Sequence, residues 1–457
     1  MIKVDLVAHT NIDPLILATL AGKTCYTEKM PEVSEVSDFG VEEKLFKVGH
    51  HTTLEHYFLT FTIKGIAVSD ITFGMHLASP FYNSDQRSGR FCAKMFLEPD
   101  FGEIENYIHE FWPQVKKIER GKVMAYIKNG VGIYHKNISE AAKIAGEFLK
   151  KERPFANEKY VDQGALKISQ EQMRMFISTI FPTAFYFTVD LIALVSLYES
   201  AWMPGMKEVT QKMADAFVEK FPQVHFMFNP ERRRKDSWAM DMPKSDSLNV
   251  KYIPSLNSLG IIGEKNFIVP DPEKMHPVDK LHFLPEMMDN SADGINVAVE
   301  ISTATMGQDQ RHRTIGRSQP KFSGNFYLPP ILRKMKMESE AKKLMRQWIE
   351  ISKNIPKSLA MAIAPYGAMV KYQKRGSFNA VLHEQAKRLC FCAQEEIYHL
   401  GKFLRMAIEK KKGKKSKLLR MLEPPCYRNG KCAEGGRYCG RDIKLRKSGD
   451  YFPKRVV

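Results

Sequence analysis

The sequence predicts a mixed α/β (α+β) protein built from two tandem modules, and three observations support this prediction. One order of segments occurs twice: a strand-like segment, a polar stretch with arginines, and helices interrupted by a proline. Between the two copies lies a stretch rich in Pro, Asn, Asp and Ser, which is typical of a linker. Finally, 44% of the 457 residues are hydrophobic, which is enough for large cores and excludes a disordered chain.

These observations place the domain boundaries. We expect a first module over residues 1–222, a linker or insertion over 223–285, a second module over 286–422 and a Cys-containing basic tail over 423–457.

In the first module, residues 57–66 are β-branched and aromatic and predict a strand. The polar residues 79–90 predict a loop. Helices are expected over residues 101–128, over 139–150 with Ser139 as the N-cap, and over 170–220 with breaks at Pro182 and Pro204.

The second module repeats this order. Residues 295–305 predict a strand, residues 307–328 a polar loop, and residues 338–353 and 378–411 amphipathic helices. Because direct identity between the two halves is low, the duplication is predicted from the order of segments rather than from matching residues.

The charge balance indicates anionic partners. The chain carries 69 Lys and Arg against 52 Asp and Glu, a net charge of +17, which favours nucleotides, folate-type polyacids or nucleic acid. Seven cysteines are too few for a disulfide scaffold, the N-terminus does not have the order of a signal peptide, and no stretch reaches the ~20 apolar residues of a membrane span. We therefore expect a soluble cytoplasmic protein without a membrane partner.

Two local motifs have the chemistry of an anion site. Arg311-His312-Arg313 follows Gln308 beside the end of a predicted strand, and arginine forks match phosphate oxygens, with about 1.5–3 kcal/mol for each charge-assisted bond. Ser88-Gly89-Arg90 combines a glycine that allows close backbone approach with two donors. Taken singly, each motif also fits a solvated basic loop or a turn.

A third motif lies on the predicted helix that begins near residue 378. His383 and Arg388 stand on it, and Glu384 and Glu395 share roughly one face with Arg388. An ion pair within the helix would explain Arg388 without any ligand.

Together these motifs resemble the flavin-dependent thymidylate synthases, whose hallmark is an Arg-His-Arg loop ending in a Ser-Gly-Arg-aromatic run after a Glu-His…Thr-Phe strand. The first half has His50 to His56 (HHTTLEH), Thr60-Phe61 and an intact Ser88-Gly89-Arg90-Phe91, but Met75-His76-Leu77 stands at the Arg-His-Arg position. The resemblance covers most of the chain outside about residues 221–285.

The second half has the complementary set. It keeps Arg311-His312-Arg313, Arg388 and the Ala-Gln-Glu-Glu-Ile run 393–397, whereas Ser323-Gly324-Asn325 stands at the Ser-Gly-Arg position. The first half has Ala201 about where the helix arginine is expected. The resemblance therefore implies two diverged copies of one module, each a mainly antiparallel sheet with packed helices. The two copies would form one composite site, and the chain would form a homodimer similar to the family's tetramer.

The resemblance also implies ligands and roles. It implies conversion of dUMP to dTMP, with methylenetetrahydrofolate as one-carbon donor, FAD as cofactor and NADPH as reductant. Arg388 would be catalytic. The dUMP contacts would be Ser88, Gly89, Arg90, Gln86, Gln308, Arg311 and Arg388, and the FAD contacts would be Arg311, His312, Arg313, His383, Ser377, Asn379, His50 and Thr52.

The sequence departs from the family pattern at two of these positions. Gln86 replaces a usual acidic residue, and Ser377 replaces a usual Asn. Two alternatives therefore stay open: flavin-dependent one-carbon transfer to another pyrimidine nucleotide, and a non-catalytic nucleotide- or nucleic-acid-binding paralogue, of which nucleic acid is the less favoured partner.

The tail carries Cys426, Cys432 and Cys439 and resembles a C-terminal extension of part of the family. Its C-x5-C-x6-C spacing lacks the tight pairs of common zinc sites. An ordered tail without metal is favoured over a zinc site, to which Cys390 and Cys392 would be further ligands.

Overall fold

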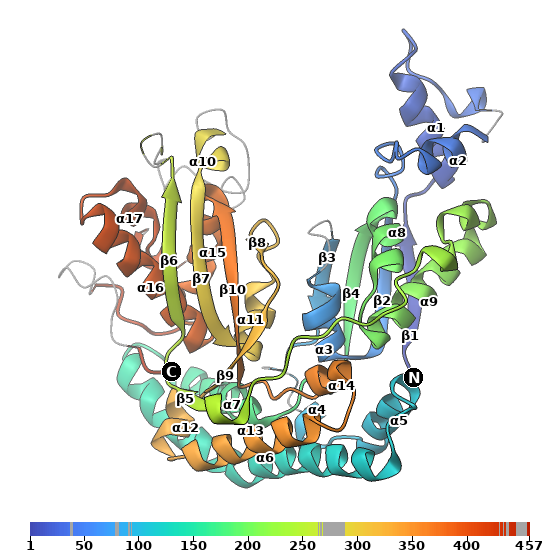
Figure 1. The fold of residues 1–457 in the computed structure, drawn as a ribbon. Coiled ribbons are helices and arrows are strands. Elements are labelled where there is room, and N and C mark those ends of the chain that lie inside the picture. The colour runs from blue at the N-terminus through green and yellow to red at the C-terminus, as the bar shows by residue number, and fades with distance from the viewer. Residues whose placement is uncertain are drawn as a thin grey trace.

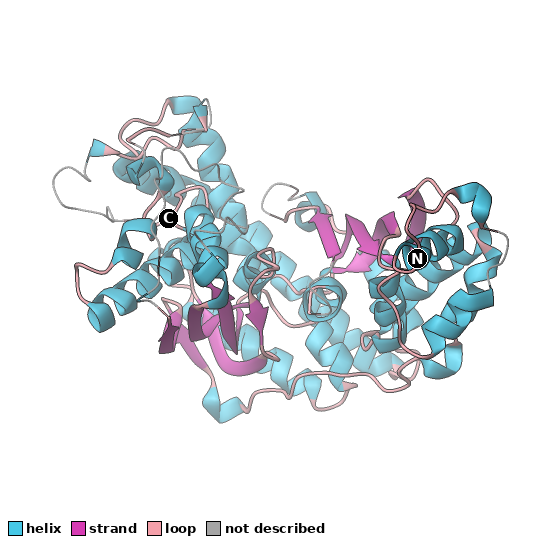
Figure 2. Cartoon of the chain, turned by 90° about the horizontal axis from the view of Figure 1, so that it is seen from above, coloured by secondary structure: helices cyan, strands magenta, loops and turns pink. Residues whose placement is uncertain are grey.

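Two β-sheets stand side by side in the computed structural model, one from each half of the chain, above a base of long helices (Figure 1). Seen from above, the sheets are two separate groups of strands flanked by helices (Figure 2). The structure describes all residues except 37–39, 78–81, 90–91, 93, 264, 266, 268–287, 429, 433, 436–437 and 445–454. The mixed α/β class with antiparallel sheets is confirmed.

The first sheet has the strand order β1-β2-β4-β3, with every neighbouring pair antiparallel. Its strands are β1 (Lys3–His9), β2 (Phe58–Ala67), β3 (Tyr82–Gln86) and β4 (Pro182–Asp190). Alternate side chains of β2, namely those of Leu59, Phe61 and Ile63, are completely buried, because successive residues of a strand point to opposite faces.

The second sheet has the order β5-β9-β10-β7-β6, and β8 pairs with β10. Only the β5–β9 pair is parallel. The strands are β5 (Asn249–Lys251), β6 (Ser255–Ile262), β7 (Gly294–Ser302), β8 (Gly316–Arg317), β9 (Lys321–Tyr327) and β10 (Ala368–Ser377). Residues expected as linker thus supply two of these strands.

Helices cover the sheets and form the base. In the first half they are α1 (Pro14–Thr24), α2 (Gly40–Lys47), α3 (Val68–Asp70), α4 (Lys94–Leu97), α5 (Phe101–Phe111), α6 (Lys117–Glu152), α7 (Glu158–Met173), α8 (Leu191–Ser200) and α9 (Pro204–Lys220). In the second half they are α10 (Met288–Ala292), α11 (Thr303–Asp309), α12 (Pro330–Lys334), α13 (Glu338–Ser352), α14 (Lys357–Ala362), α15 (Phe378–Arg388), α16 (Glu395–Lys412), α17 (Lys417–Met421) and α18 (Pro425–Arg428).

The two halves share one topology. In each, a central strand (β4 or β10) pairs with an earlier long strand (β2 or β7) on one side and with a short strand (β3 or β9) on the other. A helix with a polar N-cap follows each central strand: Asp190 accepts from the Ala193 N–H at 2.7 Å and Ser377 accepts from the Ala380 N–H at 3.2 Å. A duplicated module would give this arrangement, and common origin stays a prediction.

The two halves contact each other through the segments that directly precede their central strands, β4 and β10. Ser178 and Pro365 form an antiparallel bridge, and around it the Thr179 N–H donates to the Ala364 carbonyl and the Tyr366 N–H to the Ile177 carbonyl, both at 2.8 Å. Corresponding segments therefore contact each other across an approximate two-fold relation.

Several predicted elements were wrong in extent. The expected loops over residues 79–90 and 307–328 contain β3 and β9, because pairing with a central strand stabilises polar segments that local pattern alone assigns to loops. The helix expected at 101–128 ends at Phe111, with Trp112 as its C-cap before Pro113, and α6 is one helix that runs through Ser139. Residues 170–220 contain β4 between helices, and residues 378–411 form two helices rather than one.

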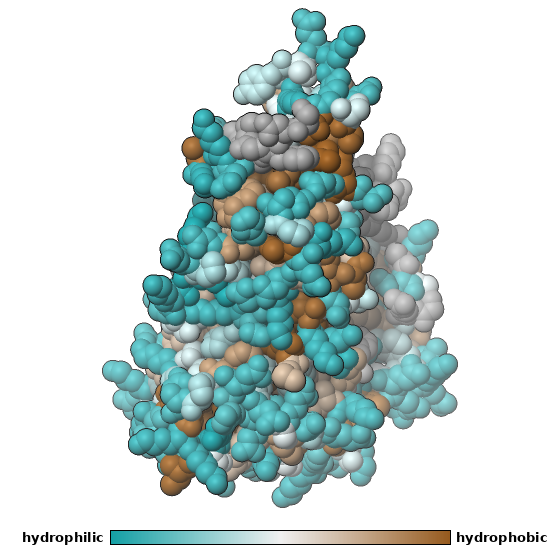
Figure 3. Space-filling view, turned by 90° about the vertical axis from the view of Figure 1, so that its right-hand side faces the viewer, coloured by the Kyte–Doolittle hydropathy of each residue, from teal (hydrophilic) through white to brown (hydrophobic). Residues whose placement is uncertain are grey.

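The face of the molecule on the side of the first half is mostly hydrophilic, with hydrophobic patches between the polar side chains (Figure 3). Within the described ranges, no helix combines the length and the hydropathy needed to cross a membrane.

Candidate active site between the two halves

A pocket lies at the junction of the two halves and encloses about 540 Å³ of empty space, including its open mouth. From the first half it is lined by Gln86, Ser88 and Gly89, which directly follow or end β3. From the second half it is lined by Gln308 and Arg311, at the end of α11. The structure thus brings together the two motifs that the sequence divides between the halves. Arg90 lies outside the described residues.

A chain of hydrogen bonds crosses the back of this pocket. The Arg174 guanidinium donates to Gln394 Oε1 at 3.1 Å, the same oxygen accepts from the Gln308 side chain, and Arg388 donates to the Gln308 carbonyl. Gln394 is completely buried and Arg174 nearly so. Arg174 and Arg311 therefore line the pocket from the two halves, where an anionic ligand would be stabilised. Arg388 lines a separate cavity between β7 and α16 and is joined to the pocket through its hydrogen bond to the Gln308 carbonyl.

Arg174 and Gln394 were not among the predicted site residues. Arg174 stands before β4 in an apolar stretch and places its guanidinium 5.3 Å from the centre of the Tyr366 ring, a cation–π distance. Gln394 belongs to the run 393–397 that carried the resemblance, so its match with the family was the available signal. For Arg174 the signal was a lone basic residue in a buried segment.

The arginine loop is fastened across the junction by Arg313. Its guanidinium donates to Asn83 Oδ1 at 3.1 Å and to Ser84 Oγ at 2.9 Å on β3, and it lies 4.8 Å from the centre of the Tyr82 ring. His76, at the first half's Arg-His-Arg position, shares Ser84 Oγ at 2.8 Å. The predicted flavin contact Arg313 therefore joins the two halves.

A buried ion cluster supports the same loop from behind. Asp309 is completely buried; it accepts from Arg317 Nε at 2.6 Å, from the Tyr372 hydroxyl at 2.8 Å and from Lys374. Lys374 also pairs with Glu384 at 2.6 Å. Glu384, which could have formed an ion pair with Arg388 within the helix, therefore forms its ion pair with Lys374.

The histidine of the arginine loop is kept neutral. Burial, followed by the nearby Arg388, lowers the pKa of His312 to about 2, and its ring lies 5.7 Å from that of His383. Burial, followed by Arg313 and Arg311, lowers the pKa of His76 to about 3. A neutral imidazole can hydrogen-bond a ligand without adding charge.

These two histidines predict acid sensitivity. Their folded-state pKa values lie below the unfolded value of about 6.5, so stability is complete above pH 6.5 and falls as the pH drops from there towards about 3. Each should lower the free energy of unfolding by up to about 1.4 kcal/mol per pH unit. Denaturant unfolding between pH 7 and 4 should show this slope, and His76→Gln or His312→Gln should each reduce it, whereas His109→Gln on the exposed face of α5 should not. An unchanged slope in both variants would contradict the assignment.

A second hollow adjoins the start of α15. A groove with about 1200 Å³ of empty space is lined by Asp293, Ser377 and Asn379 among others. Asn379 Oδ1 and His312 Nε2 are buried and have no hydrogen-bond partner in the part of the chain that the structure describes. The Asn379 atom fits a ligand bound in the groove, as the predicted flavin contacts at Ser377 and Asn379 require, whereas His312 is not among the residues that line the groove.

His50 and Thr52 lie elsewhere. They follow α2 in the first half, whereas the groove lies beside α10 and α15 of the second half (Figures 1 and 2). Within one chain, His50 and Thr52 therefore do not lie near the flavin contacts predicted at Ser377 and Asn379.

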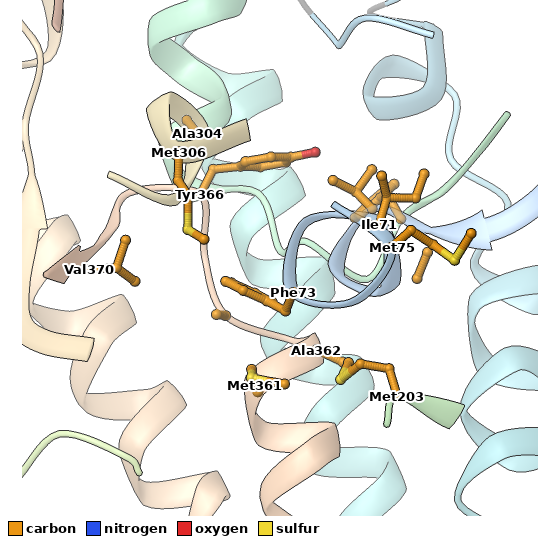
Figure 4. Packing of buried hydrophobic residues seen from close by; sticks show 14 of the residues in the cluster. Ile71, Phe73, Met75, Met203, Ala304, Met306, Met361, Ala362, Tyr366 and Val370 are labelled. Atoms are coloured by element: carbon orange, nitrogen blue, oxygen red, sulfur yellow. The ribbon is translucent and has the colours of Figure 1, made fainter. Parts of the chain in front are cut away.

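The approximate two-fold relation between the halves defines a second position, which corresponds to the junction pocket. At this second position, apolar side chains replace the polar ones. Here the indole of Trp202, next to Ala201, donates to the Phe73 carbonyl at 2.8 Å, as Arg388 does to the Gln308 carbonyl. Phe73, Met203 and Met361 are buried in the hydrophobic packing near this position (Figure 4).

The segment that connects the halves closes this equivalent position. Trp238 packs edge-on against Trp202 and its N–H donates to the Trp202 carbonyl. Pro243 and Ser247 lie against Gly324, and a Cβ there would come within 2.7 Å of Ser247 Oγ. The connecting segment therefore packs directly on the Ser-Gly-Asn segment 323–325.

The described residues contain no group of three or more His, Cys, Asp or Glu arranged to hold a metal ion. The predicted candidates Cys426, Cys432 and Cys439 are all free thiols.

The fold and the pocket define a two-module α/β protein whose arginine-lined site takes groups from both modules. Residues 5–225 match the family of thymidylate synthase complementing proteins. The match covers the first of the two halves, somewhat less than half of the chain.

Two solved structures illustrate the similarity. Flavin-dependent thymidylate synthase ThyX from Helicobacter pylori, complexed with FAD and dUMP, is 16% identical over 51% of this chain and 100% of its own, with a TM-score of 0.32. The UMP/dUMP methylase PolB from Streptomyces cacaoi, bound with 5-Br dUMP, is 16% identical over 50% of this chain and 94% of its own, with a TM-score of 0.30. No curated protein matches the sequence.

Proposed function

We propose that this chain is a flavin-dependent thymidylate synthase that converts dUMP to dTMP, with methylenetetrahydrofolate as one-carbon donor and NADPH as reductant. The observation that carries the proposal is the junction pocket, where Ser88 and Gly89 of the first half face Gln308 and Arg311 of the second. The family match over residues 5–225 supports the reaction class.

The nucleotide phosphate would bind the Ser88-Gly89 backbone and the Arg311 guanidinium. Gly89 leaves little room for a side chain, because a Cβ there would lie 3.2 Å from the Phe96 ring and 3.7 Å from the Arg174 guanidinium. A phosphate beside Arg174 and Arg311 would gain charge-assisted hydrogen bonds and would compensate for the cost of burying Arg174.

Arg388 would act on the uracil ring. A cation beside the ring edge lowers the pKa of N3 by about 1–3 units and favours the enolate-like form whose carbon is alkylated. Stabilisation of developing oxyanion charge is usually the larger catalytic effect. The hydrogen bond from Arg388 to the Gln308 carbonyl would orient the guanidinium for this purpose.

The flavin would be held by residues of the second half, with Asn379 and His312 offering their unpartnered polar atoms. When bound, it supplies the hydride that completes the methyl group. We propose that His50 and Thr52 reach the flavin from a second copy in a homodimer.

A second pyrimidine nucleotide is the alternative substrate, because Gln86 lines the pocket where the family usually has an acidic residue. An amide offers both a donor and an acceptor, which would change the contacts with a ribose hydroxyl.

The proposal predicts that the purified chain is yellow and that NADPH oxidation depends on added dUMP. With methylenetetrahydrofolate present, mass spectrometry should find dTMP. Parallel reactions with UMP test the alternative substrate. Colourless protein that binds polynucleotide in a strongly salt-dependent manner would instead indicate the non-catalytic paralogue.

The equivalent position predicts the binding stoichiometry. Each chain should bind one dUMP, because the related position in the first half has Trp202 and Phe73 where the second half has Arg388 and Gln308. Isothermal titration calorimetry should give one site per chain. Two equivalent sites per chain would contradict this assignment.

A further inference from the structure

The loop 389–393 connects two side chains of the proposed site. Arg388 is the last residue of α15, and Gln394 precedes α16 as its N-cap. Arg388 donates to the Gln308 carbonyl, and Gln394 Oε1 accepts from the Gln308 side chain. The path of this loop therefore decides how Arg388 and Gln394 stand relative to Gln308.

Two buried arginines of the tail hold this loop at its two ends. Arg441 Nη1 donates at 3.3 Å to the carbonyl of Leu389, the residue that directly follows Arg388. Arg455 Nη2 donates at 2.7 Å to the carbonyl of Ala393, the last residue of the loop. Because the donors of a guanidinium lie in one rigid plane, these bonds fix the direction of the loop as well as its distance from the tail.

The middle of the loop is packed against the same side chains. The centre of the Phe391 ring lies 3.8 Å from the Arg441 guanidinium and 5.2 Å from that of Arg455, which are cation–π distances. From the first half, Arg153 Nη2 donates to the Phe391 carbonyl at 3.2 Å. All three arginines and Phe391 are buried. The loop is therefore held along its whole length by groups from outside the second module.

The tail is itself fastened to the first half. The Phe155 N–H donates to the Gly440 carbonyl at 3.0 Å, and the Val457 N–H donates to Glu152 Oε1 at 3.3 Å. Gly440 has a φ of +77°, and a Cβ there would collide with the backbone of Ala156, so this close approach requires glycine. The described parts of the tail thus contact the first half and the loop at the same time.

We propose that Arg441 and Arg455 are positioning residues of the active site, which hold the loop 389–393 so that Arg388 and Gln394 keep the geometry needed for turnover. This inference rests on the proposed function, which assigns the role of Arg388 in dTMP formation. Simple anchoring of the tail would stabilise the fold without acting through Arg388. The two roles differ in one measurable respect, because a positioning residue loses its effect on turnover once Arg388 is removed.

The test replaces each tail arginine by methionine, whose flexible side chain still fills the space beside the Phe391 ring but offers no donor. Arg441→Met and Arg455→Met should each lower kcat by roughly 10- to 10²-fold, as expected when a reacting group is displaced by up to about 1 Å. In the Arg388→Ala background, either substitution should change kcat by less than about twofold, because its effect depends on Arg388.

Hydrogen–deuterium exchange of the full chain measures the loop directly, and the amides of residues 389–393 should exchange faster in both variants than in wild type. Circular dichroism establishes that each variant is folded. Lys444→Met is the matched control, because Lys444 is exposed in the same part of the tail as Arg441. Its replacement removes one positive charge and should leave both kcat and loop exchange unchanged.

The outcomes separate this inference from the proposed function. Full turnover by both folded variants beside active wild type would overturn the inference alone, as would unchanged loop exchange in both. Losses of kcat that multiply with the loss in Arg388→Ala would show that the arginines act independently of Arg388, which also overturns it. Wild-type protein that forms no dTMP would overturn the proposed function, and loop exchange would then still decide whether the tail holds the loop.

Discussion

Arg388→Ala is expected to lower the rate of dTMP formation by about 10²–10³-fold, the loss typical when one oxyanion-stabilising donor is removed, while the purified variant stays yellow. The substitution removes the cation proposed to act on uracil and the hydrogen bond to the Gln308 carbonyl. The proposed flavin contacts at Asn379 and His312 are unchanged by this substitution. Steady-state rates and the flavin absorbance of the same preparation measure both effects.

Lys387→Ala is the matched control. Lys387 is the preceding residue of α15 and is exposed, so its loss removes one positive charge from the same helix without touching the pocket. This control should keep most of the activity. If Arg388→Ala kept full turnover, or if Lys387→Ala lost as much, the catalytic role assigned to Arg388 would be wrong.

The junction pocket could be predicted because its chemistry depends on two short motifs, each made of a few characteristic residues that are recognisable in the sequence. A Ser-Gly pair and an arginine loop carry a phosphate-binding pattern that is visible in sequence, and the Ser-Gly-Arg run is in the first half whereas the Arg-His-Arg run is in the second. The structure places Ser88 and Gln308 around one pocket, as the complementary pattern implied.

Other parts depend on contacts between distant segments and could not be predicted. The polar strands β3 and β9 exist because β4 and β10 offer paired hydrogen bonds, and periodicity within such short segments does not reveal a partner. Arg174 reaches the pocket only because the halves meet at Ser178 and Pro365, a contact that no local pattern encodes.

The covering of the equivalent position was also invisible in sequence. Trp238 and Ser247 lie in a Pro- and Ser-rich stretch whose composition is typical of a linker, yet they pack against Trp202 and Gly324 respectively. Burial of an apolar side chain contributes about 1.5–3 kcal/mol, so the packing of Trp238 against Trp202 stabilises this position of the connecting segment.

The ion cluster behind the arginine loop provides the largest expected effect on stability. Burial alone would raise the pKa of Asp309, but Arg317 and Lys374 outweigh burial and hold that pKa well below its usual value. The folded-state pKa is thus depressed. The resulting stabilisation is complete above the unfolded value of about 3.9 and is lost as the pH falls towards the folded-state value.

Asp309→Asn should lower the free energy of unfolding at pH 7 by about 3–5 kcal/mol, because it leaves Arg317 and Lys374 buried around a neutral group with Glu384 as the remaining carboxylate. Urea denaturation followed by fluorescence measures the change. Asp241→Asn removes an exposed carboxylate from its 2.8 Å pair with Lys357 and should leave the unfolding midpoint unchanged. Equal midpoints for Asp309→Asn and wild type would show that the arginine loop does not depend on this cluster, and its position in the pocket would then require another cause.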